Sequence, residues 1–104
     1  MAQQATAEAP AQTGTLTLID YHAPWCGPCR AMEPFWHELE AEFAGKVKFE
    51  KVNVDEQREI SNAAGVMSLP TLHIKKGDKI VQTMIGYQSK EELSAKLKEA
   101  LAAQ

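Results

Sequence analysis

The sequence predicts a single α/β domain in which a mixed central β-sheet is flanked by helices, in the order βαβαββα. Three observations predict this class. An alternating apolar stretch is followed by a helical repeat of apolar residues and then by a second strand-like stretch. Such a strand-helix-strand connection implies parallel strands, with a ligand edge at their C-terminal ends. Two later strand-like stretches separated by a short Gly-containing segment indicate an antiparallel hairpin.

The first strand and helix are the clearest elements. From Thr15 to Tyr21, β-branched and apolar residues alternate with period two, and the strand should end at Ala23-Pro24. A helix is expected from about Cys26 to Ala44, stopped by Gly45, with a bend at the internal Pro34. Its apolar residues recur at helical spacing, and they are Met32, Phe35, Trp36, Leu39 and Phe43.

The middle of the chain repeats the strand-helix pattern. A second strand is expected over Val47 to Val54. Asp55 is a plausible N-cap for a short helix over Glu56 to Ala64, which Gly65 should end.

The C-terminal part predicts a hairpin and a closing helix. Its strands are Thr71 to Lys75 and Lys79 to Ile85. Ser89 to Glu92 reads as a capping box, and an apolar stripe of Leu93, Leu97, Ala100 and Leu101 follows. Residues 1–14 are Ala/Gln-rich without apolar periodicity, so we expect a flexible tail there and a folded domain over residues 15–104.

Composition excludes several classes of function. With 104 residues, 44% of them hydrophobic, the chain can build one core and not two. The net charge is −3 and no basic cluster is present, so nucleic acid is not an expected partner. No apolar run approaches the ~20 residues of a membrane helix, and residues 1–14 do not resemble an export signal. We expect a soluble monomer in the cytoplasm, or an exported protein if a leader was removed.

Both cysteines lie in the pentapeptide Trp25–Cys29, so any thiol chemistry is located there. At the start of a helix, Cys26 and Cys29 share one face and can form a disulfide. The helix N-terminus favours a thiolate at Cys26, whereas Cys29, one turn inside, should be more buried and able to resolve a mixed disulfide. Gly27 lets a partner approach, and Pro28 presets a helical φ. Neither residue carries a charge, so the dithiolate is not strongly favoured and the disulfide stays reasonably stable. A pair of this kind is expected to act as a reductant.

The competing interpretation of a CxxC pair is half of a structural zinc site. Such a site needs a second CxxC or a pair of histidines. His22, His37 and His73 lie singly in three predicted elements, so no metal site is expected.

The WCGPC pentapeptide is followed by Pro34 in the predicted helix and by Ser68–Thr71 further along the chain. With these motifs in this order, the chain resembles the thioredoxin family from about Leu18 to Leu101. The resemblance implies a thioredoxin-like sheet of four or five strands. It also implies a thiol-disulfide oxidoreductase that reduces disulfide-containing proteins, has no cofactor beyond its own disulfide and is recharged by a thioredoxin reductase-type donor. The Leu69-Pro70 bond would be cis and beside the cysteines.

The same resemblance suggests a substrate groove. Pro70 lacks an N–H group, and the backbone of Leu69 could pair with a substrate segment as an added strand. Gly65 and Gly86 match glycines near that groove, although Gly86 could equally be a turn residue. Trp25 should be exposed and contact partners.

Asp20 is a candidate proton acceptor. Alternation points its side chain inward, and a buried lone carboxylate should have a raised pKa and could exchange protons with a thiol. A solvated aspartate at a strand end is the simpler interpretation, but the resemblance matches Asp20 to the family's buried aspartate. The resemblance also matches Lys51 to a lysine near that carboxylate. Without the resemblance, Lys51 would be interpreted as a strand residue that extends its charge to solvent.

The chain departs from the family pattern at three places. Residues 1–14 are too few for the family's N-terminal strand and helix, so we expect this unit to be absent or vestigial. Whether the sheet has a fifth strand therefore stays undecided. His22 stands where the family often has Trp; an ordinary histidine would be half-charged near neutral pH, and a space-filling role is favoured over assistance to the thiolate. Relative to the family, the chain is one residue shorter from Thr71 to Gly77 and one longer from there to Gly86, which predicts a β-bulge or a shifted register.

Two rival functions stay open at this point. One is a specialised thiol-disulfide oxidoreductase, exported or not, with a dedicated partner. The other is a non-catalytic binding subunit that uses the Pro70 groove, although binding alone does not require intact cysteines.

Overall fold

The computed structural model describes residues 16–103, and its elements follow the predicted order βαβαββα. The predictions of a flexible tail and of an absent or vestigial N-terminal unit fall on residues outside this range. In chain order the elements are β1 (Leu16–His22), α2 (Gly27–Glu42), β2 (Val47–Asn53), α3 (Arg58–Ala63), β3 (Thr71–Lys76), β4 (Lys79–Ile85) and α4 (Lys90–Ala102).

The described residues form one four-stranded mixed sheet in the order β2-β1-β3-β4. Strands β1 and β2 are parallel, from the pair Leu16 and Val47 to the pair His22 and Asn53. The β1-β3 and β3-β4 pairs are antiparallel. The crossover through α2 therefore brings the C-terminal ends of β1 and β2 to one edge, as predicted.

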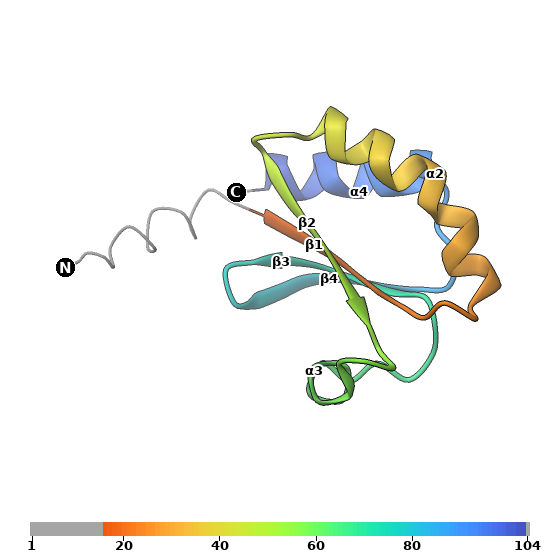
Figure 1. Cartoon of the computed structure of the whole chain (residues 1–104). Coiled ribbons are helices and arrows are strands. Elements are labelled where there is room, and N and C mark those ends of the chain that lie inside the picture. Colours follow the sequence, from red (N-terminus) through yellow and green to blue (C-terminus); the bar gives the residue numbers. More distant parts are fainter. Residues whose placement is uncertain (1–15, 104) are drawn as a thin grey trace.

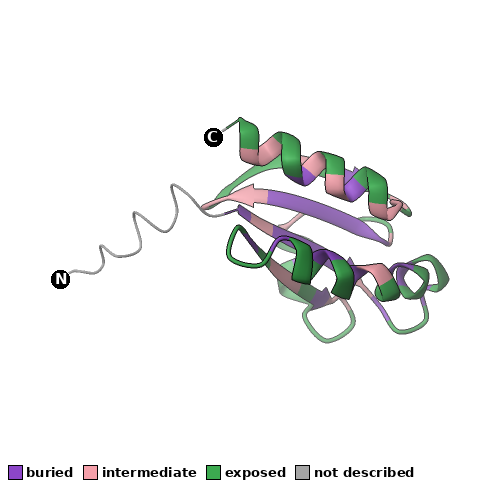
Figure 2. Ribbon diagram, turned by 90° about the horizontal axis from the view of Figure 1, so that it is seen from above, coloured by how far each residue is buried: buried purple, intermediate pink, exposed green. Residues whose placement is uncertain are grey.

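Helices cover the two faces of the sheet unequally. Helices α2 and α4 lie together over one face, and α3 lies on the opposite side (Figure 1). Strands β1 and β3 are largely buried, whereas most of the outer strand β4 and the outer sides of the helices are exposed (Figure 2). The main core fills the space under α2 and α4, and its buried members are Leu16, Leu18, Met32, Trp36, Leu39, Phe43, Val47, Leu72, Ile74, Met84, Leu93 and Leu97. A smaller cluster of Ile19, Tyr21 and Val52 packs with partly buried apolar residues on the α3 side.

Helix α2 carries the features expected of it. Cys26 is its N-cap, and Gly45 follows its C-terminal end with a φ of 82°. Pro34 lies inside the helix, which changes direction along its length in Figure 1. Trp36 is buried in the core, as predicted.

Helix α3 is shorter than predicted, and the assignment of Asp55 as its N-cap is wrong. The side-chain oxygen of Asn53 accepts hydrogen bonds from the backbone N–H groups of Asp55 and Glu56, at 2.9 and 3.3 Å. These bonds form a turn, so the helix begins only at Arg58 and without a side-chain cap. The carboxylate of Asp55 instead accepts a hydrogen bond from Trp25.

The predicted bulge is present in the hairpin. Ile74 is opposite Gln82 while Lys75 is opposite Ile80, which leaves Val81 as the additional residue on β4. The one-residue differences from the family pattern before and after Gly77 are thus accommodated inside the β3-β4 ladder.

Helix α4 begins with the predicted capping box. Ser89 Oγ accepts from the backbone N–H of Glu92 at 3.1 Å, and the Glu92 carboxylate accepts from the N–H of Ser89 at 2.8 Å. Leu93 and Leu97 then turn their side chains into the core. Among the described residues, no helix combines the length and apolarity needed to cross a membrane.

Candidate active site

The two cysteines form a disulfide at the start of α2, with their Cα atoms 5.3 Å apart. The backbone N–H of Cys29 is directed at Cys26 Sγ, at 3.2 Å, and the N–H of Cys26 donates to the carbonyl of Ala23 at 3.1 Å. The loop after β1 thus places the first sulfur at the N-terminus of the helix, as the spacing predicted.

The expected difference in burial between the cysteines is not found in the disulfide form. Cys26 is 5% exposed and Cys29 is 4% exposed. Both pack with Ala23 against the partly buried side chains of Val54 and Leu69. The disulfide holds the two sulfur atoms in one apolar cluster, which equalises their burial.

The Leu69-Pro70 peptide bond is cis, as the resemblance implied. Its surroundings are tied together by two hydrogen bonds. Thr71 Oγ1 donates to the carbonyl of Ser68 at 2.7 Å, and the N–H of Gly86 donates to the carbonyl of Pro70 at 2.8 Å. Gly86 therefore lies against Pro70 at the start of the loop that follows β4, with a φ of 93°.

A groove of about 500 Å³ opens beside the disulfide. It is lined by residues from the loop before α2, the end of β2, α3 and the segment before Pro70, namely Trp25, Val54, Arg58, Ser61, Asn62, Val66, Met67, Ser68 and Leu69. Trp25 is 69% exposed, as predicted, and Met67 is 95% exposed. This surface offers apolar contact next to a reactive disulfide.

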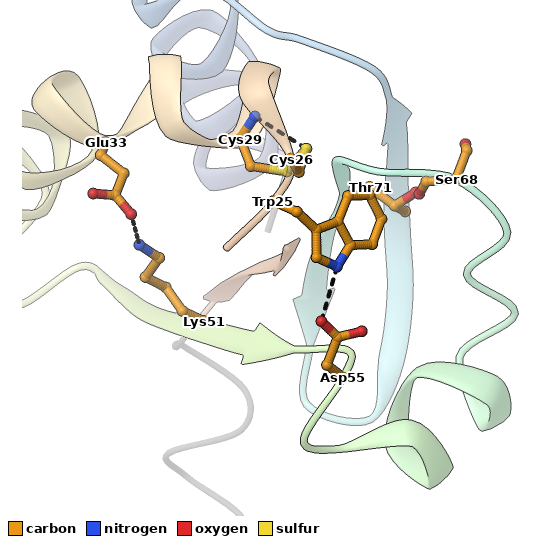
Figure 3. The surroundings of a disulfide bond; sticks show 8 residues. All are labelled: Trp25, Cys26, Cys29, Glu33, Lys51, Asp55, Ser68 and Thr71. Carbon is orange, nitrogen blue, oxygen red and sulfur yellow. Dashed lines mark hydrogen bonds and ion pairs between the residues drawn. A yellow bond between two sulfur atoms is a disulfide. The ribbon is translucent and has the colours of Figure 1, made fainter. Parts of the chain in front are cut away.

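Trp25 is fixed in place by a contact that the sequence did not reveal. Its indole Nε1 donates to Asp55 Oδ2 at 2.9 Å, and Figure 3 shows the two side chains meeting at the mouth of the site. The partners are 30 positions apart and in different loops, so no local pattern could indicate the contact.

The remaining predicted residues lie around this centre. Gly27 and Pro28 are exposed in the first turn of α2 beside the disulfide. Gly65 directly follows the C-cap of α3 with a φ of 77°, and it is not among the residues that line the groove.

Asp20 lies inside the protein in β1. It is 3% exposed, and its Oδ1 atom has no hydrogen-bond partner among the described residues. Burial raises the pKa of Asp20 to about 6; the positive charge of Lys51 opposes this shift and the negative charge of Glu33 adds to it. The inward orientation and raised pKa predicted for this carboxyl are both present.

Lys51 is the register partner of Asp20 on β2. Its ammonium group, however, forms an ion pair with Glu33 of α2, with Nζ 3.1 Å from Oε2. Glu33 was missed in the sequence, although it lies four residues after Cys29 and therefore on the same face of the helix.

The histidines do not form a metal site. No group of three or more His, Cys, Asp or Glu residues suited to a metal occurs within residues 16–103. His22 is half-buried, and burial together with the charge of Lys51 lowers its pKa. His22 is thus mostly neutral at pH 7, which corrects the expectation of half-charge.

Comparisons with known proteins agree with this geometry. The family model described as Thioredoxin matches residues 3–99. The chain is 48% identical to the thioredoxin of Alicyclobacillus acidocaldarius over 84 residues, which is 81% of this chain and 80% of the relative. It is 44% identical to the thioredoxin of Bacillus subtilis over 78 residues, or 75% of each chain. The crystal structure of oxidised mitochondrial thioredoxin 3 from Saccharomyces cerevisiae superposes with a TM-score of 0.75 at 28% identity, covering 91% of this chain and 89% of that one.

Proposed function

The chain belongs to the thioredoxin family and is a thiol-disulfide oxidoreductase, and we propose that its two cysteines have different tasks. Cys26 attacks a protein disulfide, and Cys29 resolves the mixed disulfide that forms. The observation that carries this assignment is the position of Cys26 as the N-cap of α2, with the N–H of Cys29 directed at its sulfur. A backbone donor and the positive end of the helix stabilise a thiolate there.

The reaction proceeds by two exchanges. The Cys26 thiolate bonds to one substrate sulfur, the substrate disulfide breaks, and the other substrate sulfur leaves as a thiolate that takes a proton from water. Cys29 then loses its proton and attacks Cys26 Sγ, which forms the Cys26-Cys29 disulfide and releases the second substrate sulfur. Two electrons pass to the substrate, and a thioredoxin reductase-type donor restores the dithiol.

The groove supports binding of an extended substrate segment. The segment would pair with the backbone of Leu69, where Pro70 presents no N–H, and would contact the exposed ring of Trp25. Gly27 and Pro28 would leave room for it over the disulfide, and Gly86 would support Pro70 from behind. Gly65 would act indirectly, by ending α3 at the groove wall.

Asp20 is proposed as the acceptor of the Cys29 proton, and Lys51 as a charge that tunes it. A carboxyl whose pKa is about 6 can accept and return a proton near neutral pH. Its burial under the disulfide-bearing helix supports this role.

We propose that the protein acts as a monomeric reductant in the cytoplasm. A dithiol that must be kept reduced by a donor suits a reducing compartment. The two rival functions, an exported oxidoreductase with a dedicated partner and a non-catalytic binding subunit, would both leave the chain a poor reductant of general protein disulfides.

The reduction potential of the Cys26-Cys29 couple tests the proposed function. Equilibration against glutathione, followed by thiol trapping, should give a potential of about −270 mV, as is typical of thioredoxins. A value above about −180 mV would place the chain among oxidising disulfide donors or isomerases. The Pro28→His variant is a useful comparison, because a positive charge near Cys26 should favour the thiolate and raise the potential.

We also propose that the domain folds without residues 1–14. Their removal should change the melting temperature by no more than about two degrees, because an Ala/Gln-rich sequence without apolar periodicity is not expected to contribute to a core. Calorimetry of the full and shortened chains measures this. A loss of several degrees would show that the segment supplies part of the sheet or its covering layer.

A further inference from the structure

The ion pair between Glu33 and Lys51 lies to one side of the active disulfide, between α2 and β2 (Figure 3). Figure 3 shows Glu33 reaching down from α2 and Lys51 reaching up from β2 until their charged ends meet. The side chain of Lys51 is 30% exposed, the lowest value for any cation among the four ion pairs of the described residues. Partly exposed pairs contribute little to stability. The pair matters because it fixes the position of the Lys51 ammonium group.

Lys51 has two carboxylates within reach. Asp20 is its register partner on the neighbouring strand, and parallel neighbours are only about 4.8 Å apart. The long, flexible stem of a lysine could bring the ammonium group to either side. It contacts Glu33, while Asp20 Oδ1 is left without a hydrogen bond.

We propose that Glu33 is a positioning residue that anchors the ammonium group of Lys51 and so keeps it from pairing with Asp20. Freed from Glu33, Lys51 would turn toward the buried carboxylate and hold it ionised. This role of Glu33 follows from its contact with Lys51, and it rests on the proposed role of Asp20 only for its effect on catalysis.

The other charges around Asp20 leave the direction of the effect unchanged. On β3 its register partner is the apolar Leu72. His22 of β1 interacts with Lys51 and Glu33, and its pKa is lowered, so it is mostly neutral at pH 7. The charge of Glu56 raises the pKa of His22, and His37 of α2 lowers the pKa of Glu33. Among the described residues, Glu56 forms no ion pair with His22, and His37 pairs with Glu40 and not with Glu33. Lys51 and Glu33 are the charges that act on Asp20 itself.

The test is the titration of Asp20 in the oxidised protein, followed by carbon-detected NMR of its carboxyl group. Glu33→Gln removes a negative charge and frees Lys51, and both changes favour the ionised form of Asp20. Its midpoint should therefore fall, by about one pH unit. Glu42→Gln is the matched control, because it removes the same charge from the same helix about 13 Å further along, and it should leave the midpoint unchanged.

The same substitution in a protein that lacks Lys51 separates the positioning of the lysine from the direct effect of the Glu33 charge on Asp20. In Lys51→Met the midpoint of Asp20 should rise, and adding Glu33→Gln should then lower it by less than half of the shift seen with Lys51 present. An unchanged midpoint in Glu33→Gln would overturn the proposal. So would equal shifts in the two backgrounds, since Glu33 would then act on Asp20 directly and not through Lys51.

Activity gives a separate readout. If Asp20 accepts the Cys29 proton, the pH profile of disulfide reduction by Glu33→Gln should move to lower pH together with the midpoint. A chain that reduces no protein disulfide would refute the proposed function, whereas the NMR titration would still decide the role of Glu33.

Discussion

Replacement of Cys26 by serine is expected to abolish disulfide reduction, because a serine hydroxyl is not ionised near neutral pH and cannot displace a thiolate. Cys29→Ser should also stop turnover, but for a different reason. Its Cys26 can still attack, and with no resolving thiol the mixed disulfide persists. Partner proteins should therefore be trapped by Cys29→Ser and not by Cys26→Ser, which non-reducing gel electrophoresis can measure.

The rate of alkylation distinguishes the two thiols directly. In the reduced protein, iodoacetamide should label Cys26 first near neutral pH, since the N-cap position and the N–H of Cys29 stabilise its thiolate. The two serine variants serve as each other's controls, because each retains a single thiol. Faster labelling of Cys29, or trapping of partners by Cys26→Ser, would reverse the proposed assignment.

Much of the fold could be predicted because it depends on local pattern. Period-two alternation identified β1, and helical spacing identified α2, including the burial of Trp36. The bulge at Val81 was anticipated differently, from the lengths of the segments before and after Gly77 relative to the family pattern. The two elements β1 and α2 are encoded within short stretches of chain, where hydrophobic periodicity is informative.

The contacts that the sequence did not reveal join distant segments. The turn at Asn53 displaced the start of α3. The Asn53 side chain accepts from the N–H groups of Asp55 and Glu56, and its backbone carbonyl accepts from the N–H of Gln57, one of the groups that Asp55 was expected to cap. Asp55 instead binds Trp25, and Lys51 binds Glu33 across two elements. A polar side chain can choose among several partners in space, and sequence spacing alone does not rank them.

Asp20→Asn should separate stability from activity. The pKa of Asp20 in the folded protein is about 6, compared with an ordinary value of 3.8, so the folded state binds more protons than the unfolded state between these values. Stability therefore falls as pH rises through this window, and the ionised carboxylate opposes folding fully above pH 6. At 1.36 kcal/mol per unit, the shift corresponds to an upper limit of roughly 3 kcal/mol.

The asparagine variant should accordingly be more stable at pH 7 to 8, by about 1 kcal/mol or more, since its amide still costs free energy to bury. This gain should shrink as pH falls through 6 and disappear near pH 4, where Asp20 is protonated in both states. Urea denaturation at several pH values measures the difference, and its disappearance at low pH is the internal control.

Reduction by Asp20→Asn should be slower, because Cys29 loses a nearby acceptor for its proton. General base catalysis contributes ~10²–10⁴-fold at most, and the loss here should be smaller because water can accept the proton in its place. Stability and activity should thus move in opposite directions, which a purely structural role for Asp20 would not produce. If turnover is unchanged from pH 6 to 9 while the protein becomes less stable, Asp20 is a structural hydrogen-bonding group, and the proton of Cys29 leaves by another route.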